Sequence, residues 1–95
     1  MQLGRIVGTV VATRRDPATH AWSLRMVETL NVYNQPDGSY VVAVDVVGAG
    51  VGEVVMITRG SAARQTDLTA SRPCDAVIMG IVDTWEVDDQ TQYVK

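Results

Sequence analysis

The sequence predicts an all-β domain that folds as a small barrel or sandwich. Three observations lead to this fold class. The chain has 95 residues, enough for one small domain. Its hydrophobic share of 46% is sufficient for a packed core, and valine, a strand-favouring residue, is abundant. Five strand-like runs follow one another at short spacing, with only one brief helical segment among them.

The strand-like runs are separated by turn residues. They cover, in order, residues 3–13, 22–32, 40–46, 53–58 and 76–87. Pro17 breaks the chain after the first run, and "NQPDGS" predicts a turn after the second. Ser61 is suited to the N-cap of a short helix in "SAARQTD", and Pro73 ends the segment that contains this helix.

The C-terminal residues are polar. The ending "DDQTQYVK" is compatible with a loose tail or with an added strand. We therefore divide the chain into one barrel domain over residues 1–88 and a polar C-terminal tail over residues 89–95.

Several runs are apolar on both faces. A strand with one buried face alternates apolar and polar residues, whereas "AVIMGIV", "IVGTVVA" and "VVAVDVV" are apolar at nearly every position. A barrel of this size has one interior and buries one face of each strand. The outer faces need another cover, and an identical subunit is the simplest one. The sequence therefore predicts an obligate oligomer.

The net charge and the cysteine content limit the classes of binding partner and the cellular compartment that the sequence allows. The net charge of −3 disfavours nucleic-acid and anionic-membrane surfaces, which require basic patches. The single cysteine, Cys74, forms no disulfide within the chain and indicates a reducing compartment such as the cytosol. The N-terminal apolar run is short and lacks a basic leader, so it predicts a strand rather than a signal peptide.

Residues suited to catalysis or metal binding are few. His20 is the only histidine, and Cys74 is better suited to a small buried position than to a nucleophile, because no base lies nearby in sequence. Asp83-Thr84-Trp85 is similar to the Asp-Thr-Gly of small dimeric aspartic proteases, but Trp85 replaces the glycine which that catalytic loop needs. We expect no catalytic residue, no metal site and no cofactor.

A glycine-rich stretch, "DVVGAGVGE" (residues 45–53), raises the question of a phosphate site. A dinucleotide-binding turn needs G-x-G-x-x-G before a helix, whereas here Glu53 takes the place of the last glycine and "VVMITRG" predicts a strand. A phosphate cradle is therefore not expected. Asp45 ends a strand, and we expect its side chain to cap the turn that follows.

Three segments together resemble a known family. They are "GRIVGTVVATR", "VAVDVVGAGVGEVVMITRGSAARQT" and "PCDAVIMGIVD", which span nearly the whole chain. In order and spacing they are similar to the pentameric vertex proteins of bacterial microcompartment shells, the EutN/CcmL family. Cys74 departs from the small aliphatic residue usual there, a change that keeps size and polarity.

The resemblance implies a fold, an assembly and a role. It implies a five-stranded OB-like β-barrel with one short helix, assembling as a cyclic homopentamer. Such pentamers cap the vertices of a polyhedral shell whose flat facets are hexameric shell proteins. This implies a structural protein rather than an enzyme, in the cytoplasm, within the shell of a microcompartment.

The resemblance also directs attention to two sets of residues. At the subunit interface we expect Gly48, Gly50 and Gly52, which would allow positive φ and close packing of a neighbour. Arg64 would donate an intersubunit hydrogen bond, to Glu53 or to a backbone carbonyl. The expected lining of the opening on the five-fold axis is a run of small residues: Gly60, Ser61, Ala62 and Ala63.

The function and the enclosed pathway each have an alternative interpretation at this point. The alternative function is a non-vertex oligomeric scaffold or a binding module of the OB-like class. Binding of single-stranded nucleic acid is disfavoured because it needs a basic groove with stacking aromatics. The enclosed pathway is also open between a carboxysome and a catabolic compartment, of which we favour the catabolic one.

Overall fold

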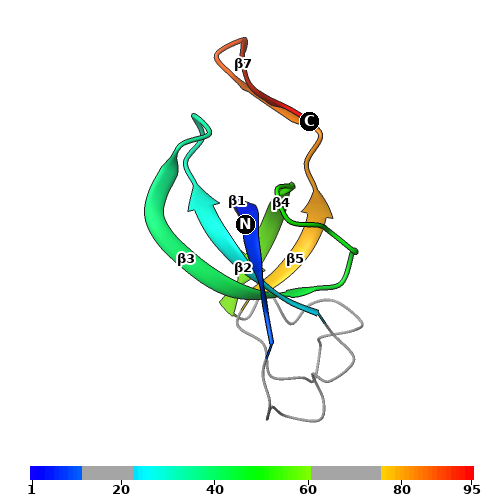
Figure 1. The fold of residues 1–95 in the computed structure, drawn as a ribbon. Helices are drawn as coiled ribbons and strands as arrows, with labels where there is room; N and C mark the ends of the chain where they lie inside the picture. Colours follow the sequence, from blue (N-terminus) through cyan, green and yellow to red (C-terminus); the bar gives the residue numbers. More distant parts are fainter. Residues whose placement is uncertain (12–22, 61–75) are drawn as a thin grey trace.

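The computed structural model describes residues 1–11, 23–60 and 76–95 of the chain (Figure 1). Seven strands form within these residues: β1 (Gln2–Val10), β2 (Ser23–Leu30), β3 (Pro36–Asp45), β4 (Val54–Arg59), β5 (Ala76–Ile81), β6 (Thr84–Val87) and β7 (Gln90–Val94). The described residues contain no α-helix, and the short helix expected after Ser61 lies outside them. None of the described segments is a helix of the length and apolarity that a membrane span requires.

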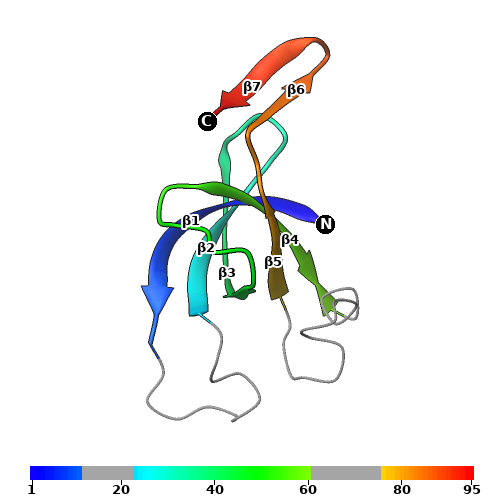
Figure 2. The same ribbon diagram turned by 90° about the vertical axis from the view of Figure 1, so that its right-hand side faces the viewer.

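Five strands close into a barrel in the order β1-β2-β3-β5-β4. All neighbouring pairs are antiparallel except β3 and β5, which run parallel and meet only at Val44–Val77 and Asp45–Ile78. The remaining two strands, β6 and β7, form a separate hairpin that projects from one end of the barrel (Figures 1 and 2). The all-β barrel predicted from the sequence is thus confirmed.

The predicted strand over residues 76–87 is wrong in one respect, because two strands occupy this range. The chain leaves β5 at Val82, whose backbone N–H donates to the carbonyl of Val54 at 2.8 Å, and starts β6 at Thr84. The turn between β2 and β3 also lies earlier than "NQPDGS" predicted. The Asn31 side-chain oxygen accepts from the N–H groups of Tyr33 and Gln35, so the chain turns there and β3 starts at Pro36.

The C-terminal residues form an added strand, one of the two alternatives that the sequence left open. β7 pairs with β6, and the boundary drawn at residue 88 falls in the turn between them. Trp85 stacks on Tyr93 with ring centroids 5.4 Å apart. The indole N–H of Trp85 also donates to the carbonyl of Val32 at 2.8 Å, which fastens the hairpin to the β2–β3 turn.

Apolar side chains gather on both faces of the barrel wall. The interior holds the largest buried cluster: Ile6, Val27, Ala43, Ala49, Val55, Ile57, Ala76 and Ile78. Val44 and Val77 belong to a second buried cluster, and because neighbouring residues of a strand point to opposite faces, they lie on the outer face. A third cluster packs Leu30 and Val54 against the hairpin. The two-sided apolar pattern of the sequence is therefore a property of the folded wall.

Candidate functional site

The glycine-rich loop, residues 46–53, connects β3 to β4 and is the feature that the sequence singled out. Ala49 in its middle is fully buried and belongs to the interior cluster of the barrel. On either side of Ala49 the loop exposes Val47 and Val51 to solvent. The loop thus anchors itself in the core and displays two aliphatic side chains outward.

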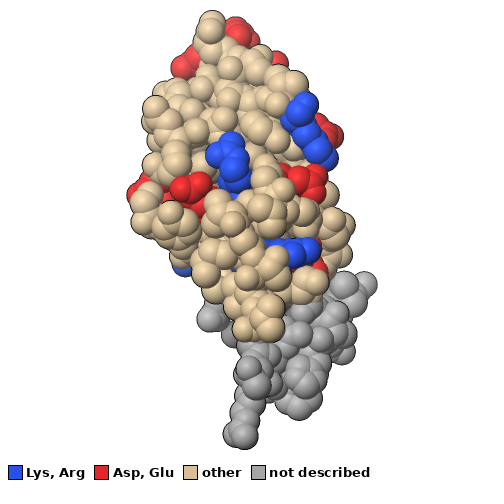
Figure 3. Space-filling model, viewed as in Figure 1, with Lys and Arg blue, Asp and Glu red and all other residues tan. Residues whose placement is uncertain are grey.

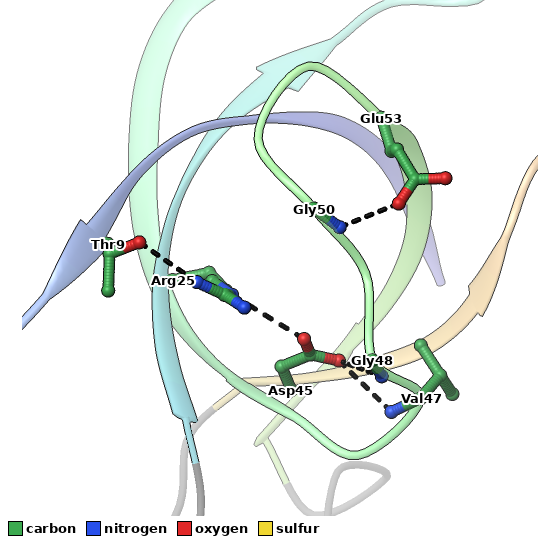
Figure 4. A network of polar contacts seen from close by, with 7 residues as sticks. All are labelled: Thr9, Arg25, Asp45, Val47, Gly48, Gly50 and Glu53. Carbon is green, nitrogen blue, oxygen red and sulfur yellow. Dashed lines mark hydrogen bonds and ion pairs between the residues drawn. The ribbon is translucent and has the colours of Figure 1, made fainter.

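Asp45 holds the start of the loop, as the sequence predicted. Its Oδ1 accepts hydrogen bonds from the backbone N–H of Val47 at 3.0 Å and of Gly48 at 2.9 Å (Figure 4). Its Oδ2 lies 3.5 Å from Nε of Arg25, and Nη1 of Arg25 donates to Oγ1 of Thr9 at 2.9 Å. The buried carboxylate therefore joins the loop to three strands, β1, β2 and β3.

Glu53 holds the end of the loop. Its Oε1 accepts from the backbone N–H of Gly50 at 2.6 Å, and its Oε2 lies 2.8 Å from Nζ of Lys95. The hydrogen bond from Lys95, followed by that from Gly50, lowers the pKa of Glu53, and the same contact with Glu53 raises the pKa of Lys95. The carboxylate is thus engaged on both oxygens within its own chain.

Backbone hydrogen bonds fix the loop against β1. The N–H of Gly52 donates to the carbonyl of Ile6 at 2.8 Å, and the N–H of Ile6 donates to the carbonyl of Glu53 at 3.0 Å. The loop is therefore held in place by its own backbone, two carboxylates and a buried alanine. Such a loop is preorganised for contact, because little conformational entropy remains to be lost on binding.

The prediction of positive φ holds for two of the three glycines. Gly48 has φ 80° and Gly52 has φ 94°, a conformation that side chains other than glycine rarely adopt. Gly50 is not among the residues with positive φ, so that part of the prediction is wrong. At Gly50 the chain is shaped instead by the bond from its N–H to Glu53, and an added Cβ would lie 3.5 Å from Oε1, an ordinary contact.

The other predicted site residues lie elsewhere. Gly60 is exposed at the end of β4 with φ 63°. Residues 61–64, which complete the predicted axial lining and include Arg64, lie outside the described residues, as do His20 and Cys74. Their roles stay predictions. No local sequence signal pointed to Lys95 or Arg25, since both reach their carboxylate partners from distant positions in the chain.

The described residues also bear on two other kinds of site, those for metal ions and those for nucleic acids. They contain no group of three or more histidine, cysteine or acidic side chains arranged to hold a metal ion. On the face shown in Figure 3, the described lysine and arginine side chains are scattered among acidic ones and form no basic patch. Nucleic-acid binding would need such a patch.

Removing the Asp45 side chain should destabilise the protein. Asp45→Ala leaves two backbone N–H groups and Arg25 without their acceptor, and we expect the free energy of unfolding to fall by about 2 kcal/mol. Asp83→Ala is the matched control, because Asp83 is exposed and accepts through its backbone carbonyl. Urea unfolding of both variants tests this, and equal losses would contradict the capping role.

The contact between Glu53 and Lys95 should make stability depend on pH. A lowered pKa of Glu53 in the folded state means that its contribution is present above the ordinary carboxylate pKa of about 4.3 and is lost as the pH falls through the folded value. Glu53→Gln should therefore lower the urea midpoint at pH 7 and have a smaller effect at pH 3.5. Glu86→Gln, at an exposed position of β6, is the control. A Glu53→Gln effect of equal size at both pH values would contradict the prediction.

Comparison with known proteins identifies the family. The family described as ethanolamine utilisation protein EutN/carboxysome matches residues 1–83. The chain belongs to the EutN/CcmL family. The carboxysome shell vertex protein CcmL of Gloeobacter violaceus is 43% identical over 100% of this chain and 95% of its own length. Its solved structure superposes with a TM-score of 0.94 and covers 100% of this chain and 98% of that one.

Relatives from other microcompartments match at similar identity. The shell vertex protein GrpN of Rhodospirillum rubrum is 44% identical over 90% of this chain and 97% of its own length. Its structure, described as a pentameric microcompartment shell protein, has a TM-score of 0.84 and covers 92% of this chain and 99% of that one. The shell vertex protein EutN of Escherichia coli is 40% identical over 87% of each chain. These EutN/CcmL relatives do not favour the catabolic compartment toward which the sequence alone leaned.

Proposed function

We propose that this protein forms homopentamers that cap the vertices of a polyhedral bacterial microcompartment in the cytoplasm. One observation carries the proposal: proteins described as shell vertex proteins share 43–44% identity with this chain over 90–100% of its length. A solved relative described as pentameric has the same fold. The role depends on the five-fold shape of the pentamer. Flat sheets of hexamers cannot close into a polyhedron, and pentamers at the vertices provide the curvature that closure requires.

The role we assign is structural and not enzymatic. The chemistry available in the described residues supports this assignment. Asp45 and Glu53, the two carboxylates of the glycine-rich loop, are both engaged in holding backbone N–H groups. Hexameric shell proteins are the partners that a vertex role requires.

The glycine-rich loop is our candidate for one half of the contact between subunits. Gly48, Gly50, Gly52 and Glu53 shape the loop, which lies at the surface and exposes Val47 and Val51. Arg64 of a neighbouring subunit would then donate to Glu53 or to a loop carbonyl, and residues 60–63 would line the axial opening. Because Glu53 already accepts from Gly50 and Lys95, a backbone carbonyl is the better acceptor for Arg64.

Co-expression with hexameric shell proteins tests the vertex role. We expect closed polyhedral particles when this protein is present and open sheets or tubes when it is absent, as judged by electron microscopy. Closed particles of the same size and number without it would contradict the vertex role and favour a scaffold inside the compartment.

A further inference from the structure

The outer wall of the barrel carries an apolar patch that is separate from the interior core. The outer patch consists of Val7 on β1, Met26 on β2, and Tyr40 and Val42 on β3. Met26 stands opposite Gly8 on one side and Val42 on the other, so the patch crosses three adjacent strands. Val7, Tyr40 and Val42 are 43%, 60% and 44% exposed, while Met26 is half-buried between them.

The same region contains an open strand edge. Within the described residues, Pro36–Ala43 of β3 pairs only with β2, because β5 joins β3 no earlier than Val44. An unpaired edge is a template for another strand or loop, and proteins usually protect such edges with charges, proline or a covering segment. The part of the edge over residues 40–43, Tyr-Val-Val-Ala, has no charged residue and no proline.

The glycine-rich loop lies on a different side of the barrel from this edge. In Figure 1 the curved first half of β3 forms the left margin of the barrel, whereas the green loop after β3 lies on the right. A ring built by rotation needs two different surfaces on each subunit, one for each neighbour. The loop and the β3 edge meet this requirement, and both display aliphatic side chains.

We propose that the outer patch and the open edge of β3 receive the glycine-rich loop of the next copy of this chain. The inference rests on the proposed pentamer and names its two contacting surfaces. Val47 and Val51, held outward by the anchored loop, would cover Tyr40 and Val42, and the loop backbone would meet the unpaired groups of β3. The partner is a second copy because a solved relative of the same fold is described as pentameric, and a ring needs two different surfaces on each subunit.

A charge placed on the β3 edge tests the receiving surface. Val42→Lys should convert a pentamer into a monomer in native mass spectrometry, or raise the concentration at which half the pentamer dissociates at least tenfold. Val32→Lys is the matched control, because Val32 is similarly exposed but lies in the β2–β3 turn outside the outer patch. A Val42→Lys pentamer that dissociates like the wild type would overturn the proposal.

A cysteine pair tests the occupant without disturbing assembly. In a Cys74→Ser background, Tyr40→Cys combined with Val51→Cys should give, after mild oxidation, a non-reducing gel ladder of linked chains up to five. The control pair, Tyr33→Cys with Val51→Cys, should give no ladder. Absence of the ladder from the first pair would overturn the loop as occupant, even where Val42→Lys dissociates the pentamer.

The cysteine pair also decides the outcome if Val42→Lys does not fold, as judged by circular dichroism. A ladder then supports the proposal and its absence overturns it. Failure of the proposed function is recognised separately, because it is seen in the wild-type protein. A wild-type chain that is not a pentamer contradicts both the proposed function and this contact, whereas a wild-type pentamer with an unaffected Val42→Lys variant contradicts the contact alone.

Discussion

Ala49→Asp should leave the protein without a stable barrel. Ala49 is 1% exposed and packs in the interior cluster with Ile6, Val27 and other aliphatic residues. A carboxylate at this position would be buried without a cation or hydrogen-bond donor, or the loop would have to leave the core. Either result costs about 4 kcal/mol or more, a large part of the total stability of a small domain.

Thermal unfolding followed by circular dichroism measures this effect. Val51→Asp is the matched control, because it places the same charge two residues further along the same loop at an exposed side chain. The control should retain the strand signal of the folded chain while weakening the pentamer. If Ala49→Asp kept the strand signal and melted no lower than Val51→Asp, Ala49 would not be the anchor of the loop.

Gly4→Ala should be the second most damaging of these substitutions. A Cβ at Gly4 would overlap Cγ1 of Val27 and would lie 3.2 Å from the carbonyl oxygen of Glu28. Val27 is fully buried and β-branched, so it has little freedom to move aside, and the carbonyl belongs to the β2 backbone. We expect a loss of about 3 kcal/mol in the free energy of unfolding, the upper range for overpacked cores.

Gly8→Ala supplies the control for Gly4→Ala. Both glycines lie on β1 opposite β2, but the nearest atom to a Cβ at Gly8 is Cβ of Met26 at 3.9 Å, an ordinary contact. Gly8→Ala should therefore change the unfolding free energy by less than about 0.5 kcal/mol. Equal urea midpoints for the two variants would show that β1 and β2 are not packed as closely as the structure has them.

The sequence predicted the parts of the fold whose causes are local. Asp45 caps residues two and three positions ahead of it, a contact that a side chain and its own turn determine. The barrel strands follow from runs of β-branched residues between turn signals. Positive φ at Gly48 and Gly52 was predictable for the same reason, since only the backbone conformation of a short loop is involved.

Features that depend on distant partners could not be predicted from local pattern. The apolar run after Ala76 continues through Val82, whose N–H still bonds to Val54 of β4, but β5 ends at Ile81 and the chain starts the separate hairpin at Thr84. β7 is polar and becomes a strand only because β6 lies beside it and Trp85 stacks on Tyr93. Likewise, no residue near Glu53 in the sequence indicates that Lys95 binds its carboxylate.

The native mass of the purified wild-type protein tests the central claim most directly. One chain has a mass of 10.3 kDa, so a pentamer has five times that mass, or 51.5 kDa. Native mass spectrometry over a dilution series should show a single 51.5 kDa species, with monomer emerging only at the lowest concentrations. A folded monomer of 10.3 kDa across the whole series, or a ring of another size, would contradict the assignment of this barrel as a five-fold vertex.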